Sequence, residues 1–158
     1  MSPGDEVTIS EAMGECFYLP GKTDQPLLMI GTGSGLAPLY GILRDALSNG
    51  HEGAIHLFHG ARTTEGLYLT DELNRLAAET PHFHYQPSVS NPEDGVSMPI
   101  LTGRATDIAF GTHPDLKGWR VYLCGNPEMV RTGQMKAFLA GASLDEIQAD
   151  PFDNQASS

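Results

Sequence analysis

The sequence predicts an α/β fold, an open parallel sheet of about five strands flanked by helices. Two observations predict it. Short apolar stretches alternate along the chain with segments whose apolar residues recur at helical spacing, and this alternation is typical of a parallel sheet. At residues 27–47 an unbroken apolar stretch passes through a glycine-rich turn directly into such a helix. A strand without polar residues indicates a strand that is covered on both faces.

The unit at residues 27–47 carries the strongest functional signal. Residues 27–30 are the expected strand, Gly31, Gly33 and Gly35 form the turn, and residues 36–47 are the expected helix. Glycine tolerates positive φ and lets a ligand approach the backbone. A helix start directs unpaired N–H groups at whatever lies beyond the strand. The sequence therefore predicts an anion site at residues 32–36, for which phosphate is the usual ligand.

This turn is not one of the two commonest phosphate motifs. Leu36 and Pro38 stand where G-x-G-x-x-G requires glycine, and no Gly-Lys-Ser/Thr follows as in a P-loop. A tight strand-to-helix turn without a ligand is the alternative. Pro38 itself fits the first turn of a helix, where its missing N–H costs little.

Further strands and helices complete the pattern. Strands are expected at residues 54–59, 83–89, 119–124 and, from a weak signal, 143–149. Helices are expected at residues 71–79, 103–110 and 127–140. Thr70 is a candidate cap for the first of these, and Asn126 followed by Pro127 is a typical start for the last.

The first twenty residues predict a separate unit. Residues 6–10 alternate like a half-buried strand, and residues 16–19 suggest a second short strand. Two strands alone are not stable. We therefore expect residues 1–20 to be the trailing edge of another β domain, residues 21–26 a linker, residues 27–152 the main domain and residues 153–158 a tail.

Composition excludes several classes of protein. The net charge is −11 over 158 residues, which argues against binding to nucleic acid or to anionic membranes. Cys16 and Cys124 are the only cysteines, and no zinc or iron–sulfur spacing occurs, so no metal site is expected. Signal-peptide and membrane-spanning patterns are lacking, so a cytoplasmic location without membrane insertion is expected. The six histidines are interpreted as structural.

Ligands of open α/β sheets bind beyond the carboxyl ends of the strands. The predicted strand ends form one candidate crevice. The candidate binding residues there are Gly31, Thr32, Gly33, Ser34, Gly35, Leu36, Pro38, Gly60, Ala61, Arg62, Ser90, Asn91, Cys124, Gly125, Asn126 and Pro127.

Three ordered motifs resemble the C-terminal NAD(P)-binding domain of the ferredoxin–NAD(P) reductase family, as found in oxygenase reductases. They are Gly31-Thr-Gly-Ser-Gly-Leu-Ala-Pro38, then His59-Gly-Ala-Arg62 with Gly66-Leu-Tyr-Leu-Thr-Asp-Glu-Leu73, and Tyr122-Leu-Cys-Gly-Asn-Pro-Glu-Met-Val130. Asn126 stands where the family more often has Pro. Residues 4–9 and 13–17 resemble the end of the family's flavin-binding barrel. The resemblance covers nearly the whole chain and implies a Rossmann-like domain.

The resemblance implies transfer of a hydride from a nicotinamide to FAD, and then of electrons to an iron–sulfur protein or oxygenase component. The FAD-binding R-x-Y-[ST] motif is lacking here, so the FAD is expected on a missing N-terminal domain and the chain alone is expected to be inactive. Cys124 and Asp150 are the implied catalytic residues: Cys124 faces the nicotinamide, where its place before a helix start is expected to lower its pKa, and Asp150 orients the ring. Met129 and Phe152 complete the implied nicotinamide wall.

The resemblance also bears on the choice of cofactor. NADP-specific members tend to carry Ser-Arg where this chain has Ser90-Asn91. Asn91 lacks the guanidinium that grips a 2′-phosphate, so NADH is favoured over NADPH. Arg62 is a candidate contact for the pyrophosphate or a 2′-phosphate, and Arg104 is the nearest replacement cation. A dinucleotide-binding module without turnover and a flavodoxin-like FMN binder are the alternatives to a reductase.

Overall fold

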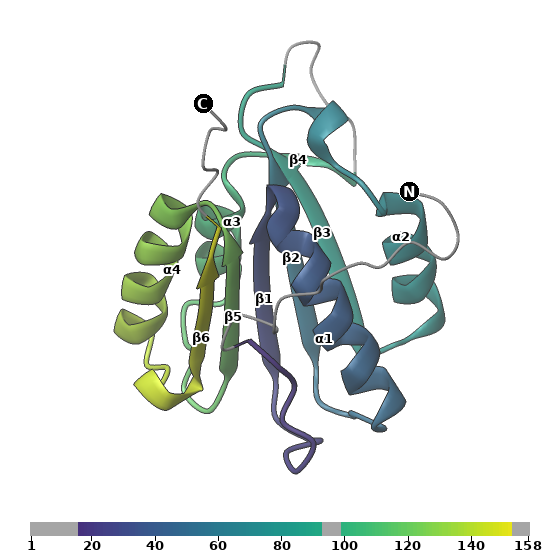
Figure 1. The fold of residues 1–158 in the computed structure, drawn as a ribbon, viewed down its shortest axis with the longest axis vertical. Coiled ribbons are helices and arrows are strands. Elements are labelled where there is room, and N and C mark those ends of the chain that lie inside the picture. Colours follow the sequence, from purple (N-terminus) through teal and green to yellow (C-terminus); the bar gives the residue numbers. More distant parts are fainter. Residues whose placement is uncertain (1–15, 93–98, 153–158) are drawn as a thin grey trace, which may run out of the picture.

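Six parallel strands form one sheet in the computed structural model, which describes residues 16–92 and 99–152. Their order across the sheet is β4-β3-β2-β1-β5-β6 (Figure 1). The bounds are β1 Leu27–Thr32, β2 Ile55–Ala61, β3 Phe83–Val89, β4 Leu101–Thr102, β5 Arg120–Gly125 and β6 Ile147–Pro151. The strand order reverses direction at β1, so a crevice opens between the ends of β1 and β5.

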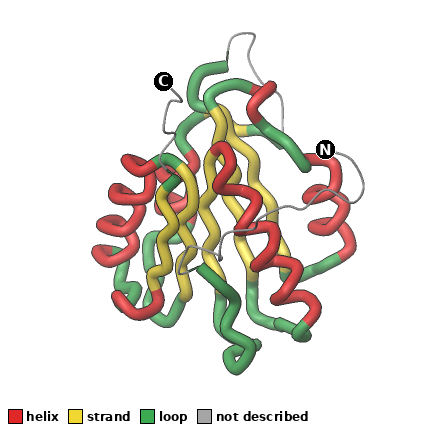
Figure 2. The backbone as a smooth tube through the Cα atoms, in the orientation of Figure 1, coloured by secondary structure: helices red, strands yellow, loops and turns green. Residues whose placement is uncertain are grey.

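Four helices cover the sheet, two on each face (Figure 2). They are α1 Leu36–Ser48, α2 Thr70–Glu79, α3 Ala105–Thr112 and α4 Pro127–Leu139. Buried side chains of α1 and α2 belong to one core cluster, and those of α3 and α4 belong to the other. The helices α1, α3 and α4 each begin within four residues of the end of a strand, and these strands end at the crevice. Three helix starts therefore lie near the crevice.

The position of β1 in the middle of the sheet explains why residues 27–30 are all apolar. Leu27 and Met29 pack into the core beneath α1 and α2, while Leu28 and Ile30 pack into the core beneath α3 and α4. All four side chains are buried. Burying each of them contributes about 1.5–3 kcal/mol, which fixes β1 as the middle of the domain.

The strands and helices predicted for residues 27–152 are confirmed with small changes at their ends, and the sheet has one more strand than expected. The short edge strand β4 follows the 93–98 stretch, and its two residues pair with Ser88 and Val89. The helix predicted to start at Gly103 begins at Ala105. The weakly signalled last strand is shifted to Ile147–Pro151.

Two local predictions were wrong. Thr70 is not the cap of α2 but its first residue, because Leu69 takes the cap position with a positive φ of 59° and no side-chain cap is made. Residues 16–19 do not form a strand, because they pair with no strand of the sheet. The strand expected at residues 6–10 lies outside the described residues.

The segment before β1 is nevertheless tied to the sheet. The Tyr122 hydroxyl donates to the Phe17 carbonyl at 3.0 Å. The Tyr18 hydroxyl lies 3.0 Å from Nδ1 of the buried His51. These two contacts hold residues 17 and 18 on the face that α1 and α2 cover.

A charge network around the buried Arg120 joins the same segment to β5 and to the turn before β6. Arg120 is 4% exposed and contacts Glu146 at 2.9 Å and the Tyr122 hydroxyl at 2.9 Å. Lys22 contacts the other Glu146 oxygen at 2.6 Å. Burial opposes the ionisation of Glu146, but hydrogen bonds from Lys22 and Arg120 outweigh it and lower its pKa.

Within the part of the chain that the structure describes, no helix is long and apolar enough to cross a membrane. Among those same residues, no group of three or more His, Cys, Asp or Glu side chains is arranged to hold a metal ion.

Candidate functional site

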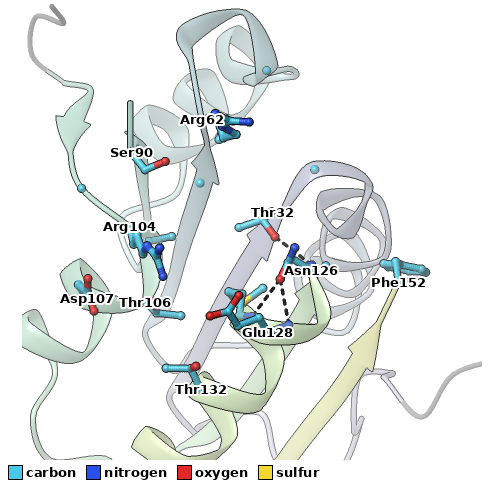
Figure 3. Close-up of a pocket in the computed structure, with 18 of the residues that line it drawn as sticks. Thr32, Arg62, Ser90, Arg104, Thr106, Asp107, Asn126, Glu128, Thr132 and Phe152 are labelled. Atoms are coloured by element: carbon cyan, nitrogen blue, oxygen red, sulfur yellow. Dashed lines mark hydrogen bonds between the residues drawn. The ribbon is translucent and has the colours of Figure 1, made fainter. Parts of the chain in front are cut away.

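A cavity of about 570 Å³ lies at the carboxyl ends of the strands, where the crevice was predicted (Figure 3). This volume is within the range of sites for small molecules and cofactors. Its walls come from the ends of β1, β2, β3, β5 and β6 and from the starts of α3 and α4. The lining residues are Thr32, Gly33, Ser34, Gly60, Ala61, Arg62, Gly66, Ser90, Gly103, Arg104, Ala105, Thr106, Asp107, Gly125, Asn126, Glu128, Met129, Thr132 and Phe152.

The turn after β1 presents its backbone to this cavity. Gly33 has a φ of +55°, which L side chains rarely adopt, and a Cβ atom there would meet open space. Gly35 packs on the β5 backbone, where a Cβ atom would overlap the Cys124 carbonyl. Glycine is therefore needed at Gly33 for conformation and at Gly35 for close packing. The result is a helix start that faces the cavity with little side-chain cover.

The turn after β5 meets the β1 turn. The Asn126 N–H donates to Oγ1 of Thr32 at 3.2 Å. Oδ1 of Asn126 accepts from the N–H groups of Glu128 at 2.9 Å and Met129 at 3.2 Å, which confirms the predicted cap of α4. Gly125 has a φ of +133°, and a Cβ atom there would overlap Thr32. The two turns thus form one surface.

Tyr68 supports the β1 turn from outside, and the sequence prediction missed it. Its hydroxyl donates to the Gly33 carbonyl at 2.7 Å. Its ring packs edge-on against His59 at 5.5 Å. Burial lowers the pKa of His59 to about 4, so this imidazole is neutral at physiological pH, and its Nδ1 lies 2.8 Å from the Tyr85 hydroxyl. The only sequence signal for Tyr68 was its place in the motif of residues 66–73.

Charged and hydroxyl side chains gather at the β2–β3 end of the cavity. Figure 3 shows Arg62, Ser90 and Arg104 on one side and Phe152 on the far side, with Thr32 and Asn126 between them. From one side of the cavity to the other, these residues stand in the same order as the strands that they end or follow. An extended ligand would therefore lie across the strand ends.

Cys124 and Asp150 are placed beside the cavity rather than in its lining. They are partners in the register of β5 and β6. The Cys124 side chain is fully buried, with its Sγ 3.8 Å from the Sγ of Cys16. The hydrogen bond to Cys16, burial and the charge of Asp150 raise the pKa of Cys124, so the expected lowering by the helix start was wrong. Burial also raises the pKa of Asp150.

The predicted site residues fall into two groups. Eleven of them line the cavity: Thr32, Gly33, Ser34, Gly60, Ala61, Arg62, Ser90, Gly125, Asn126, Met129 and Phe152. The others lie behind or beside it: Gly31, Gly35, Leu36, Pro38, Asn91, Cys124, Pro127 and Asp150. Asn91 is exposed, and its N–H donates to the Arg62 carbonyl. Gly66, residues 103–107, Glu128 and Thr132 also contribute to the walls, and of these only Arg104 was weighed from the sequence as a cofactor contact.

These residues fit a dinucleotide. The glycine turn leaves backbone exposed to an anion, Thr32 adds a hydroxyl, and two guanidinium groups stand at one end. Helix starts and guanidinium groups are the usual protein partners of phosphate.

Comparison with known proteins decides the family. The model of the oxidoreductase NAD-binding domain matches residues 29–134. The chain belongs to this family. The resemblance to the NAD(P)-binding domain of ferredoxin–NAD(P) reductases, inferred from the three motifs, is confirmed.

Related proteins of known function support the same assignment for this NAD-binding domain. The ferredoxin–NAD(P)+ reductase component of naphthalene 1,2-dioxygenase/salicylate 5-hydroxylase systems from Ralstonia sp. is 36% identical over 152 residues, which are 96% of this chain and 45% of that protein. The reductase subunit of an aromatic O-demethylase from Amycolatopsis is 36% identical over 141 residues, 87% of this chain and 41% of that protein. The chain thus spans less than half the length of these relatives.

Solved structures agree. The crystal structure of an Amycolatopsis cytochrome P450 reductase matches with a TM-score of 0.77 and 33% identity, over 84% of this chain and 39% of that one. A ferredoxin NADP+ reductase from Neisseria gonorrhoeae, solved with bound FAD and NADP, matches with a TM-score of 0.69 at 23% identity, over 87% of this chain and 61% of that one. The second match speaks for the fold alone.

Proposed function

We propose that this NAD-binding domain binds NADH across the ends of its strands and presents the nicotinamide to FAD held by another domain of the same protein. The observation that carries the proposal is the joined surface of the β1 and β5 turns, linked by the hydrogen bond between Thr32 and Asn126. Its free helix start suits the pyrophosphate, which is the most charged part of the ligand.

The order of groups along the cavity sets the direction of the dinucleotide. Arg62 and Ser90 follow β2 and β3, so the adenosine half lies at that end. Asn126, Met129 and Phe152 follow β5 and β6, so the nicotinamide ribose lies at the other end. When bound, the nicotinamide supplies the hydride and the flavin accepts it, while the protein supplies binding and orientation.

Cys124 and Asp150 act as positioning residues at the nicotinamide end. Burial contributes to the raised pKa of the Cys124 thiol and of the Asp150 carboxyl, so each loses its proton less readily than in water. A thiol that keeps its proton places no negative charge beside the ring, whose own charge changes during hydride transfer. Neither residue is proposed as a nucleophile.

NADH is the proposed cofactor, in preference to NADPH. The cavity lining carries two cations, Arg62 and Arg104, and two carboxylates, Asp107 and Glu128. The formal charges of these four lining residues sum to zero, and Asn91, which follows β3, carries no guanidinium to bind the 2′-phosphate of NADPH. Asp107 and Arg104 line the same wall of the cavity. The Asp107 carboxylate also forms an ion pair with Lys136 at 2.8 Å.

The protein that contains this domain is proposed to be the reductase component of an oxygenase system. The named relatives support this, since they are reductase components or subunits of a dioxygenase/hydroxylase system and of an aromatic O-demethylase. Residues 1–20 are proposed as the end of the FAD domain and residues 21–26 as the linker. The electron acceptor is then an iron–sulfur protein or the oxygenase itself, and a cytoplasmic location fits this role.

Calorimetric titration of the chain with NADH and with NADPH tests the cofactor proposal. We expect tighter binding of NADH. Asp107→Asn should strengthen the binding of NADPH more than that of NADH, because it leaves the lining with a net positive charge. Asp45→Asn makes the same change of charge on the exposed face of α1 and should alter neither. Tighter NADPH binding by the unmodified chain would contradict the proposal.

A further inference from the structure

The only two cysteines of the chain meet across the fold. Cys16 lies in the segment before β1, and Cys124 lies on β5, 108 residues later. Their Sγ atoms are 3.8 Å apart. A disulfide bond is about 2.05 Å long, so the two sulfurs need to approach by less than 2 Å.

The surrounding contacts determine which cysteine makes that approach. Cys124 is held on both sides, because β5 is paired with β1 and β6. Cys16 is half-buried and belongs to a segment without regular secondary structure. The next residue, Phe17, is fixed through its carbonyl by the Tyr122 hydroxyl. A change at residue 16 alone therefore brings the sulfurs together while the sheet stays in place.

We propose that Cys16 and Cys124 form a reversible disulfide when a low-molecular-weight disulfide such as oxidised glutathione is present. The Cys16 thiolate attacks one sulfur of glutathione disulfide, the S–S bond breaks, and one glutathione thiolate leaves. The Cys124 thiol then loses its proton as it attacks the Cys16 sulfur of this mixed disulfide, and the second glutathione leaves as a thiolate. The two cysteines lose two protons and two electrons, and glutathione disulfide takes them up.

The exposures of the two residues suit this order of events. The half-buried Cys16 is accessible to a small disulfide, whereas Cys124 is fully buried. Cys124 is therefore the resolving thiol, protected from direct attack by the reagent. Disulfides in reducing compartments are usually transient or redox-sensing, and a reversible pair matches that role.

The bond would regulate the site described above, and this part rests on the proposed function. Cys124 is the register partner of Asp150 and directly precedes Gly125 in the β5 turn. A disulfide removes its thiol from the nicotinamide end and fixes the segment before β1 beside it. The adenosine end, at Arg62 and Ser90, lies across the sheet and is unaffected. Oxidation should therefore weaken the binding of NADH more than that of ADP-ribose, which lacks the nicotinamide.

The test begins without nucleotide. The full chain is equilibrated in glutathione buffers of increasing oxidised fraction, quenched with acid, alkylated and weighed by mass spectrometry. We expect a species that is two hydrogens lighter, monomeric and unreactive to the alkylating reagent. In urea the same conversion should need a ratio of oxidised to reduced glutathione at least about tenfold higher, because only the fold holds the thiols together.

Cys16→Ser and Cys124→Ser are the matched controls, and neither should form the lighter species. Accumulation of mixed glutathione adducts or of disulfide-linked dimers in place of the lighter monomer would overturn the proposal. An equal midpoint in urea and in native buffer would also overturn it.

Calorimetry of the reduced and oxidised chains then separates this inference from the proposed function. Weaker NADH binding after oxidation, abolished in Cys16→Ser, supports the regulatory role, and equal NADH binding in both forms contradicts it. If the disulfide forms but the reduced chain binds neither ADP-ribose nor NADH, the proposed function fails while the cysteine pair stands.

Discussion

The hydroxyl of Thr32 accepts a hydrogen bond from the backbone N–H of Asn126 at 3.2 Å, across 94 residues of sequence. The contact joins the turn that follows β1 to the turn that follows β5, at the point where the strand order reverses. Each turn alone is a common way to pass from a strand to a helix. Joined, they present two helix starts to one cavity, and the predictions below test that arrangement.

Replacing Thr32 with valine should weaken nucleotide binding without changing the fold. Valine has the shape of threonine but cannot accept the Asn126 hydrogen bond. The net value of such a bond is about 0.5–1.5 kcal/mol, so we expect the dissociation constant for ADP-ribose to rise roughly two- to twelvefold. Thr32→Ser keeps the hydroxyl and should bind nearly as the original does. Equal affinity in Thr32→Val would remove this hydroxyl from the site.

Gly33→Val should weaken binding at least about tenfold because of backbone conformation. The φ of +55° at Gly33 costs an L residue about 1–2 kcal/mol, and a β-branched side chain suits it least. Asparagine tolerates this region, so Gly33→Asn should retain part of the affinity. Gly41→Val, on the exposed face of α1, is the control and should bind normally. Full binding by Gly33→Val would show that the turn is not the phosphate site.

Tyr68→Phe tests the support of the β1 turn. It removes the hydrogen bond to the Gly33 carbonyl and keeps the ring against His59. We expect ADP-ribose binding to weaken by roughly two- to tenfold, with a loss of about 0.5–1.5 kcal/mol at most in the free energy of unfolding. Tyr40→Phe removes a comparable bond to Glu72, away from the cavity. If Tyr68→Phe and Tyr40→Phe bind ADP-ribose with the same affinity, Tyr68 has no role in holding the turn.

Glu146→Gln should destabilise the domain. Breaking a buried ion pair by removing one partner costs about 3–5 kcal/mol, and we expect roughly the lower end, because Arg120 still donates to Tyr122. Urea unfolding measures the loss. Glu79→Gln breaks the exposed pair with Arg75 and should cost no more than about 0.5 kcal/mol. Similar losses in the two variants would contradict the account of the network.

The same network predicts a pH dependence. Because the folded-state pKa of Glu146 lies below its ordinary value of 4.5, its contribution is complete above that pH. It is lost as the pH falls through the folded-state value. The free energy of unfolding should therefore drop below pH 4.5 less steeply in Glu146→Gln than in the original chain. Identical slopes would contradict the assigned cause of the shift.

Cys124→Ala tests the proposed hydride-transfer site in the full flavoprotein that contains the domain. The positioning role predicts a slower reduction of the flavin by NADH, with a smaller change in the dissociation constant of NADH. Stopped-flow measurement over a range of NADH concentrations separates the two. Met135→Ala, which changes an exposed side chain of α4 outside the cavity lining, is the control and should leave the rate unchanged. Unaltered reduction kinetics in Cys124→Ala would remove Cys124 from the site.

Sequence reasoning was accurate where one local pattern determines the structure. The apolar run of β1 requires cover on both faces, and both cores are present. Asn126 followed by Pro127 indicates a helix start whatever surrounds it, and the predicted cap is made. The ends of the strands, and hence most of the cavity wall, follow from these elements by the ordering of a parallel sheet.

Features that depend on contacts between distant segments were not predictable in this way. Tyr68 supports the β1 turn from 35 residues away, and its place in the motif of residues 66–73 does not indicate this contact. The expected low pKa of Cys124 considered only the following helix, whereas the contact with Cys16 and burial decide the shift. The two-residue strand β4 is too short to show a periodicity. Thr70 had the composition of a cap, but the positive φ of Leu69 places the helix start one residue earlier.

The most direct test of the central claim is calorimetric titration of the chain with ADP-ribose. This ligand carries the pyrophosphate and both of its riboses but no nicotinamide, so its binding does not depend on a flavin domain. The account predicts saturable binding at one site, retained in Gly41→Val and weakened at least about tenfold in Gly33→Val. An absence of saturable binding, or equal binding by the two variants, would contradict it.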